Sequence, residues 1–212
     1  MRLLFPFIGV RPKQFDFNKE TKWSYMGREK FKELLDSLYD EQWRHGTRSA
    51  VWLYGTKGYG KSHLLAALAY YLSASKDRIV YIPDCRDLIK DPIPYIQAAM
   101  MFAWAEEDDR LREIACLGTL EKINKFIKSC GSSIFIIGQM DALATRDRDN
   151  ETAKKHADIS TWLTKLWMGH KAIISSSANY QGYLERAVEQ TTEDTLRVYD
   201  GLTPVSLNSN RR

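Results

Sequence analysis

The sequence predicts an α/β domain of three layers, in which a mainly parallel sheet is flanked by helices. From residue 49 onward, short apolar runs typical of strands alternate with longer runs typical of helices. Strands joined in this way by helices favour parallel β-α-β units with right-handed crossovers. The 212 residues are enough for one such domain with a sizeable core and too few for two.

The composition agrees with an intracellular globular protein. Hydrophobic residues make up 44% of the chain and charged residues 27%, and no apolar run is long enough to span a membrane. The opening MRLLFPFIGV is interrupted by Pro6 and is followed by no small-residue cleavage site, so secretion is not expected. We therefore expect a location in the cytoplasm or nucleus and no contact with a membrane.

The charge and the cysteines point to no other class of partner. The net charge of +4 is compatible with a nucleic-acid partner, but no nucleic-acid-binding motif accompanies it. Cys85, Cys116 and Cys130 are far apart and show no C-x-x-C spacing. Neither a disulfide framework nor a zinc site is therefore predicted.

The first predicted elements lead up to a glycine-rich loop. Residues 1–24 are expected to be irregular. Apolar side chains recur at helical spacing over 27–46, which predicts one amphipathic helix. The run SAVWLY (49–54) is expected to be a strand buried on both faces. The chain from Lys61 to Ala74, rich in Leu and Ala, is expected to be a long helix.

Strands and helices alternate along the rest of the chain. Strands are predicted at RIVYIP (78–83), SSIFIIGQMDAL (132–143) and HKAIISSSANY (170–180), with a weaker signal in LRVYDGL (196–202). Helices are predicted at 92–106, 109–129 and 152–168. The domain as a whole is placed at 25–203, and 204–212 is expected to be a polar tail.

The stretch GTKGYGKS (55–62) fits the pattern G-x-x-x-x-G-K-[ST] and stands between a predicted strand and a predicted helix. Its glycines let the backbone curl so that N–H groups point at phosphate oxygens, and the following helix adds the positive end of its dipole. Lys61 is then placed to reach the β- and γ-phosphates, and the Ser62 hydroxyl to ligate Mg²⁺. The motif therefore predicts binding of a nucleoside triphosphate, taken here as ATP with Mg²⁺.

The nucleotide is expected to contact the whole of this loop and the start of the helix. For His63 the alternative is a packing or solvent-facing role. The predicted contact residues are Gly55, Thr56, Lys57, Gly58, Tyr59, Gly60, Lys61, Ser62 and His63.

A carboxylate is expected at the end of a neighbouring strand, where it would hold Mg²⁺ from the side opposite Ser62. The run IFII is followed by Gly138 in place of that aspartate, and then by Gln139 where a catalytic glutamate often stands. Asp141 is the remaining candidate, either as the metal partner or as a cap of the following helix or loop. Gln139 and Asp141 are predicted to be catalytic, and Ser62 and Asp141 to be the metal ligands. An aspartate introduced at position 138 is expected to restore the site, unless the backbone requires glycine there.

A polar residue after the strand AIISSS is the third candidate. In P-loop ATPases with a strand inserted between the loop strand and the acidic strand, such a residue senses the γ-phosphate. Asn179 is predicted in this role, with Ser175 to Ser177 as alternatives. A polar loop cluster without a catalytic role is the competing interpretation, because Ser and Asn are common turn formers.

Four segments together resemble the P-loop NTPase domain of crinkler-type proteins of oomycetes and fungi, which is grouped with the AAA+ and STAND ATPases. The segments are LYGTKGYGKSHLLAALAYYL, RIVYIPDCRDL, IFIIGQMDAL and IISSSANY. The resemblance implies an ATP-binding domain, usually joined to a nuclease-like or kinase-like effector domain. It gives Gly55, Gly60, Lys61 and Ser62 the phosphate and metal roles. Gln139 would belong to an Asp-Gln pair whose aspartate is replaced here by glycine.

Three functional classes remain open. The first is an ATPase module of a multidomain effector, and the second is a nucleotide-binding remnant that does not hydrolyse. The third is a small-molecule or nucleotide kinase, for which Arg186 and Arg197 are the candidate lid arginines. LRVYDGLTPVSL resembles a last core strand and the lead into a helical lid, and the lid, its sensor arginine and an effector domain are expected to be absent. Self-association is left open.

Overall fold

The computed structural model describes residues 2–9, 11–15, 22–25, 27–44, 50–55, 58–144, 150–176 and 195–197. Within them, five strands form one sheet in the order β4-β5-β6-β3-β7, and each neighbouring pair is parallel. The strands are β3 (Val51–Tyr54), β4 (Ile79–Ile82), β5 (Ile134–Ile137), β6 (Lys171–Ser175) and β7 (Thr195–Arg197). The predicted α/β class with a parallel sheet is therefore confirmed.

Strands β3, β4 and β5 are built of apolar and aromatic residues, because both faces of the sheet are covered. Every residue of β4 and β5 is buried, and in β3 only Trp52 is partly exposed. Parallel sheets covered on both faces show continuous runs of apolar residues instead of an alternating pattern. The runs IVYI and IFII are the signal by which the sequence predicts these strands.

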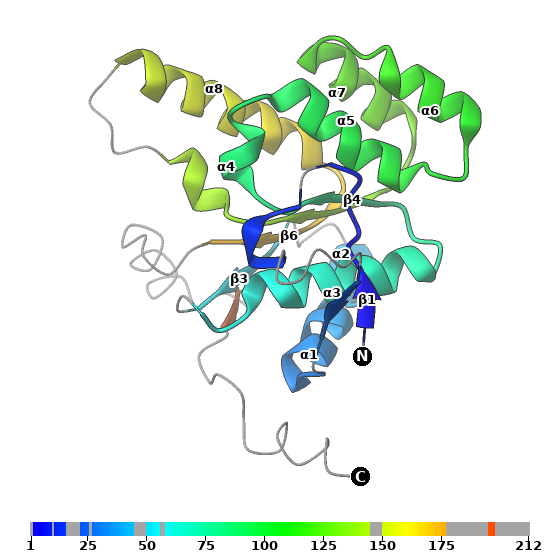
Figure 1. Cartoon of the computed structure of the whole chain (residues 1–212), viewed down its shortest axis with the longest axis vertical. Helices are drawn as coiled ribbons and strands as arrows, with labels where there is room; N and C mark the ends of the chain where they lie inside the picture. Colours follow the sequence, from blue (N-terminus) through cyan, green and yellow to red (C-terminus); the bar gives the residue numbers. More distant parts are fainter. Residues whose placement is uncertain are drawn as a thin grey trace.

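Helices lie on both faces of the sheet (Figure 1). The connection from β3 to β4 passes β6 and β5 in one direction, whereas those from β4 to β5 and from β5 to β6 run in the opposite direction. Because such crossovers are right-handed, α3 (Lys61–Ala74) covers one face and the later connections cover the other. The later connections contain α4 (Cys85–Leu88), α5 (Pro92–Ala103), α6 (Asp108–Ala115), α7 (Leu120–Ser129) and α8 (Asn150–Trp167).

The amino-terminal part packs mainly against α3, and its Phe7 also contacts Tyr95 of α5. It contains β1 (Arg2–Leu4), η1 (Lys13–Phe15), β2 (Lys22–Ser24), α1 (Glu29–Leu38) and α2 (Glu41–Arg44). β1 pairs antiparallel with β2, with Leu3 opposite Trp23, and both side chains are buried. This ordered strand pair differs from the irregular segment predicted for 1–24. Three-residue strands carry too little periodicity to be read from sequence, and contacts with distant residues stabilise them.

Two predicted helices are each divided in the structure. The helix predicted over 27–46 ends at Leu38, and the indole Nε1 of Trp43 donates to the Ser37 carbonyl at 2.7 Å, in place of the next helical N–H. The helix predicted over 109–129 is split into α6 and α7. Thr119 starts α7, because its hydroxyl accepts a hydrogen bond of 3.2 Å from the Lys122 N–H.

The predicted strand at 132–143 is shorter than expected. It ends at Ile137, and Gln139 adopts a left-handed conformation with φ of 59°. The chain then forms the short helix η2 (Met140–Leu143). This turn determines where the polar residues that follow β5 are placed.

The longest of the described helices, α8, has 18 residues and is amphipathic. Its buried side is formed by Ile159, Trp162, Leu163 and Leu166, and its exposed side carries charged residues. No helix in the described part of the chain is both long enough and apolar enough to cross a membrane.

Candidate functional site

The glycine-rich loop connects the carboxyl end of β3 to the first turn of α3, as the sequence predicts. Gly55, Gly58 and Gly60 have φ angles of 155°, 91° and 74°. Side-chain-bearing residues rarely adopt these values, so glycine is required for the path of this loop. Gly60 directly precedes α3, and its carbonyl accepts the Leu64 N–H at 2.9 Å. Thr56 and Lys57 lie outside the described residues.

Lys61 is folded back over the loop. Its side chain is largely buried, with 8% of the residue exposed, and its Nζ donates to the Gly55 carbonyl. Burial lowers the pKa of the Lys61 ammonium, and the Asp141 carboxylate partly offsets that effect. Lys61 and Asp141 therefore lie close enough to interact electrostatically.

The neighbours of Lys61 on the first turn of α3 face different surroundings. Ser62 is half-buried and is the second residue of α3, directly after the loop. The His63 ring packs against Phe15 and Trp23, with centroids 4.7 and 5.5 Å apart. Burial, and to a smaller extent the Arg28 charge, lowers the pKa of His63. The ring joins the β1–β2 strand pair to α3, and its contact with a nucleotide stays a prediction.

Arg28 also belongs to this site, although no motif in the sequence indicates it. Its guanidinium donates to the carbonyl of Tyr59. A Cβ added to Gly60 would lie 2.8 Å from a guanidinium nitrogen of Arg28. The residue stands directly before α1, 31 positions ahead of Tyr59, so only the tertiary fold brings it to the loop.

Gly138, at the position of the expected aspartate, is in contact with the backbone of the neighbouring strand. Its N–H donates to the Ile82 carbonyl at 2.8 Å, and its carbonyl accepts the Cys85 N–H at 3.1 Å. A Cβ at this position would lie 2.3 Å from the carbonyl oxygen of Pro83. The close approach of the chain after β4 therefore leaves no room for any side chain at position 138.

Asp141 lies within η2 and is half-buried. It is not the first residue of that helix, and its backbone carbonyl accepts the Ala144 N–H at 3.1 Å. Gln139, in its left-handed conformation, is half-buried at the start of the turn. Of these two predicted catalytic residues, Asp141 is the one with an electrostatic effect on Lys61.

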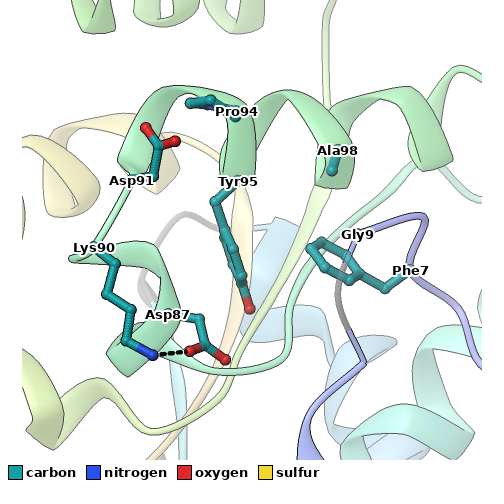
Figure 2. Close-up of a pocket in the computed structure, with 8 residues that line it drawn as sticks. All are labelled: Phe7, Gly9, Asp87, Lys90, Asp91, Pro94, Tyr95 and Ala98. Atoms are coloured by element: carbon teal, nitrogen blue, oxygen red, sulfur yellow. Dashed lines mark hydrogen bonds and ion pairs between the residues drawn. The ribbon is translucent and has the colours of Figure 1, made fainter.

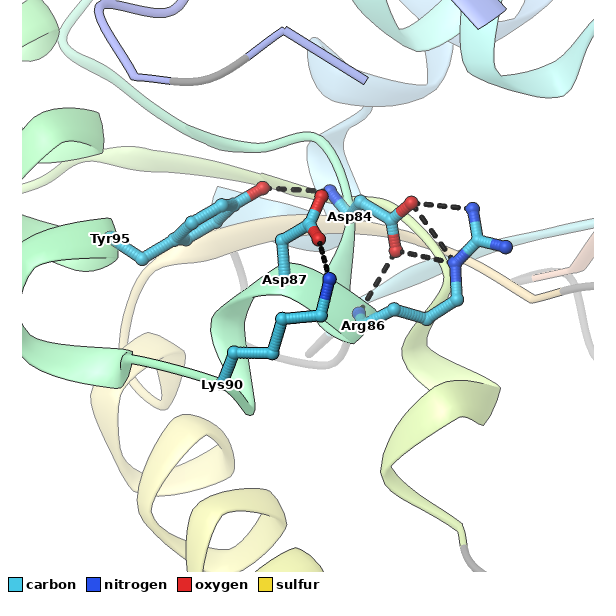
Figure 3. A network of polar contacts seen from close by, with 5 residues as sticks. All are labelled: Asp84, Arg86, Asp87, Lys90 and Tyr95. Carbon is cyan, nitrogen blue, oxygen red and sulfur yellow. Dashed lines mark hydrogen bonds and ion pairs between the residues drawn. The ribbon is translucent and has the colours of Figure 1, made fainter. Parts of the chain in front are cut away.

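An ion pair between the buried Asp84 carboxylate and the largely exposed Arg86 side chain follows β4, next to this turn (Figure 3). The Asp84 side chain is 4% exposed, and its carboxylate accepts hydrogen bonds of 2.9 and 3.0 Å from the Arg86 Nε and one of 2.9 Å from the Arg86 N–H. The Asp84 N–H donates to the Tyr95 hydroxyl at 3.1 Å. The hydrogen bond to Asp84 is the main cause that raises the pKa of Arg86, and Asp87 and Asp141 add to it.

This ion pair belongs to the edge of the candidate site. Helix α4, which begins directly after Asp84, packs against η2. Arg86 and Lys61 both interact electrostatically with Asp141, so two positive charges act on that carboxylate. The sequence motifs do not indicate Asp84 or Arg86 as site residues, because neither belongs to the glycine-rich loop or to the strand that is expected to carry the acidic residue.

Two of the serines proposed to sense phosphate lie at the end of β6. Ser175 and Ser176 are both buried, and the Ser176 N–H donates to the Leu53 carbonyl at 3.4 Å. Among the described residues, the Ser176 hydroxyl has no hydrogen-bond partner. Ser177 and Asn179 lie outside the described part of the chain, as does Arg186, whereas Arg197 is the last residue of β7.

The sheet topology brings these groups to one edge. β6 lies between β3 and β5, with Leu53 opposite Ser175 and Ile174 opposite Ile137. The loop after β3, Ser176 after β6 and Gln139 after β5 therefore follow neighbouring carboxyl ends. Ligands of open α/β sheets bind outside these ends.

The donor set at this edge suits a magnesium ion. Ser62 and Asp141 offer hydroxyl and carboxylate oxygens, and Mg²⁺ in nucleotide sites is held by one or two protein oxygens together with phosphates and water. No group of three or more His, Cys, Asp or Glu side chains able to hold a metal occurs among the described residues. An ion at this edge would therefore depend on the phosphates for part of its coordination.

This chain is similar to known proteins in its structure and not in its sequence. No protein-family model matches the chain, and the search of curated proteins finds no match. A DNA replication initiation factor is similar in structure, with a TM-score of 0.39 and 13% identity, over 81% of this chain and 47% of that one. A Walker-type ATPase of Pyrococcus abyssi has a TM-score of 0.45 and 17% identity, over 90% of this chain and 57% of that one. The chain thus spans about half the length of each.

Proposed function

We propose that this chain is a P-loop module that binds ATP with Mg²⁺ and hydrolyses it slowly or not at all. The observation that carries the proposal is the loop between β3 and α3, in which three glycines have positive φ angles and Lys61 is folded back over the backbone. Such a loop presents N–H groups and the Lys61 ammonium to phosphate oxygens. Phosphate binding is the function that this combination of geometry and charge supports best.

The order of the strands supports the class of P-loop protein. With β6 between β3 and β5, the sheet has the inserted strand found in ATPases that sense the γ-phosphate from its end. The Ser176 hydroxyl, buried and without a partner among the described residues, is a candidate for that role. In the proposal it complements Asn179, which the sequence favours.

Ser62 and Asp141 would hold the magnesium ion, which neutralises phosphate charge when bound. The Asp141 carboxylate lies within electrostatic reach of Lys61, which is the arrangement needed when both act on one triphosphate. Gln139 would orient water, a weaker role than that of a carboxylate base. Because position 138 has no room for an aspartate, the chain is expected to bind ATP and to hydrolyse it slowly or not at all.

A nucleotide-binding module without turnover is the second candidate. The contact between Gly138 and the chain after β4 favours it, since the usual position of the second carboxylate anchor is sterically closed. A kinase remains the third interpretation. The resemblance to crinkler NTPase domains, with the effector domain that it implies, rests on the sequence segments and is part of the proposal, whereas self-association stays open.

The test is titration of the purified chain with fluorescent ATP and GTP analogues, with and without Mg²⁺, alongside an assay of phosphate release. Saturable binding strengthened by Mg²⁺ is expected. Release of phosphate at a steady rate selects the ATPase, and binding without release selects the inactive module. Absence of binding to either analogue by the folded chain contradicts both.

A further inference from the structure

A cavity of about 410 Å³ lies between the amino-terminal segment and the helices α4 and α5 (Figure 2). None of the residues that line it belongs to the glycine-rich loop or to η2. Its volume falls in the range of sites that bind small organic molecules. The nucleotide site does not account for it.

The walls of the cavity are apolar and partly aromatic. Phe7 and Tyr95 line it with their ring centroids 5.0 Å apart and their planes tilted by 44°. Pro94 and Ala98 add apolar surface from α5. Gly9 allows this arrangement, because a Cβ there would lie 2.5 and 2.8 Å from atoms of the Phe7 ring. Such walls can accommodate a flat aromatic ring, because aromatic rings pack against one another in tilted or offset contacts.

The rim of the cavity carries more negative than positive charge. Asp87 is paired with Lys90 at 2.7 Å, so these two charges offset one another. Asp91 is exposed at the start of α5, and its side chain makes no capping hydrogen bond to that helix. The positive end of the α5 dipole offsets about half of the Asp91 charge. The remaining negative potential favours a cation at the Asp91 end.

The Tyr95 hydroxyl provides a neutral polar group at the inner side of the cavity. It accepts the Asp84 N–H at 3.1 Å and keeps its own proton, because burial raises the pKa of Tyr95 well above its usual range. A phenol that accepts one hydrogen bond can still donate another. The cavity therefore combines apolar walls, one hydroxyl donor and, beside the Asp87–Lys90 pair, the exposed carboxylate of Asp91.

We propose that this cavity binds a small organic cation in which a flat ring is joined to an amine. The ring lies against Phe7 and Tyr95, and the ammonium pairs with Asp91. The proposal is independent of nucleotide binding, because it uses none of the residues of the glycine-rich loop.

Tryptamine is a suitable probe, with indole-3-propionate as a control of the same ring and the opposite charge. By calorimetry, tryptamine is expected to bind the full chain with a Kd of about 1 mM, as a ligand of its size allows. Indole-3-propionate is expected to bind at least about tenfold more weakly, because it lacks the charge-assisted contact. Lys61→Ala should bind tryptamine as the parent does, which separates this result from that of the nucleotide site.

Two variants locate the binding. Asp91→Asn keeps the shape of the rim and is expected to remove most of the preference for the cation, whereas Asp109→Asn, on the exposed surface of α6, should leave it unchanged. Ala98→Phe fills the cavity and is expected to abolish binding, after its fold has been checked by circular dichroism. Equal affinity for the two probes, no binding of either, or unchanged binding in Asp91→Asn would overturn the proposal. Binding only of longer cationic peptides would overturn it in favour of a protein partner.

Discussion

Lys61 holds its charge on a side chain that is largely buried over the loop between β3 and α3. In the structure its ammonium donates to the Gly55 carbonyl, an interaction that phosphate oxygens can replace. Arg28 supports the same loop through the Tyr59 carbonyl. Among the described residues, Lys61 and Arg28 therefore both bind carbonyls of the loop backbone, each from a different part of the chain.

Lys61→Ala is expected to weaken nucleotide binding by at least about tenfold, because a charge-assisted contact contributes about 1.5–3 kcal/mol. Titration with a fluorescent ATP analogue measures the effect. Lys128→Ala on α7 is the matched control and should bind as the parent does. Unchanged affinity in folded Lys61→Ala would contradict the assignment of the loop.

Asp141→Asn is expected to weaken Mg²⁺-dependent binding by about tenfold, since one carboxylate–metal contact is lost. Binding without Mg²⁺ at neutral pH should change little. The measurement is the ATP-analogue affinity over a series of Mg²⁺ concentrations. If the ATP-analogue affinity changes with Mg²⁺ concentration in the same way in the parent and in Asp141→Asn, Asp141 is not a metal ligand.

The same variant has a consequence for pH dependence. The protonated Lys61 binds phosphate, so affinity without Mg²⁺ is present below the Lys61 pKa and is lost as the pH rises through it. Burial lowers that pKa and Asp141 raises it. Without the carboxylate, the affinity should therefore be lost at a lower pH than in the parent. A shift in the opposite direction, or none, would show that the two groups do not interact.

Gly138→Ala is expected to lower stability by about 1–3 kcal/mol, the usual cost of forcing an extra group into a packed site. The cause is the contact of 2.3 Å between the added Cβ and the Pro83 carbonyl. Gly118→Ala is the control, because a Cβ there meets nothing within 4 Å. Thermal melting compares the two variants. Equal melting temperatures of Gly138→Ala and the parent would contradict the steric argument.

The same clash is expected in Gly138→Asp, which the sequence alone suggests as a way to restore the metal site. The larger side chain would start from the same clash, so this variant is expected to be less stable than Gly138→Ala and not to gain hydrolysis. A folded Gly138→Asp protein with faster phosphate release would show that the chain after β4 can move away.

At the scale of elements, the chain segments after β4 and β5 form one unit. The Cys85 N–H to Gly138 carbonyl bond extends the pairing of the two strands beyond their ends. Helix α4 begins there and packs against η2, which carries Asp141. The position of Asp141 therefore depends on how α4 is held, and the Asp84–Arg86 pair is the interaction that starts this helix.

Asp84→Ala is expected to destabilise the protein by about 1–3 kcal/mol, because it removes a helix cap and a charge-assisted contact together. Asp87→Ala is a matched control, since its ion pair with the exposed Lys90 contributes less than about 1 kcal/mol. Denaturant unfolding measures both.

If Asp84 acts only through stability, Arg86→Lys should leave the Mg²⁺ dependence of nucleotide binding unchanged. If the pair also positions Asp141, Arg86→Lys should weaken that dependence.

At the scale of the whole molecule, strand order decides which loops meet. A ligand held by the ends of β3, β5 and β6 joins segments that are far apart in the chain. Binding to the native state alone raises its stability by an amount set by ligand concentration and Kd. The sheet should therefore gain stability as a unit when the site is filled.

ATP with Mg²⁺ at about 100 times its Kd should stabilise the chain by about 2.7 kcal/mol, which corresponds to a rise of about 5–11 °C in Tm for a domain of this size. Differential scanning fluorimetry measures the shift. Lys61→Ala should lose it, and the Lys128→Ala control should keep it. A rise of equal size in Lys61→Ala would mean that the nucleotide binds elsewhere.

Features of the fold that depend on local chemistry can be predicted from the amino-acid sequence. The runs IVYI and IFII predict buried strands, the alternation of strands and helices predicts a parallel sheet, and GTKGYGKS predicts a loop whose glycines need positive φ angles. Each signal lies within a few neighbouring residues, where apolar periodicity and backbone freedom act directly. Helix α3 begins and ends at the predicted residues for the same reason.

Features that depend on residues far apart in the chain become visible in the folded structure and not before. The β1–β2 strand pair is stabilised by the core, and Arg28 reaches the loop from 31 positions away. The sequence shows a glycine where an aspartate is expected, but only the approach of Pro83 from the neighbouring strand explains why no side chain fits there. Long-range packing determines these contacts, and no local pattern of residues carries information about it.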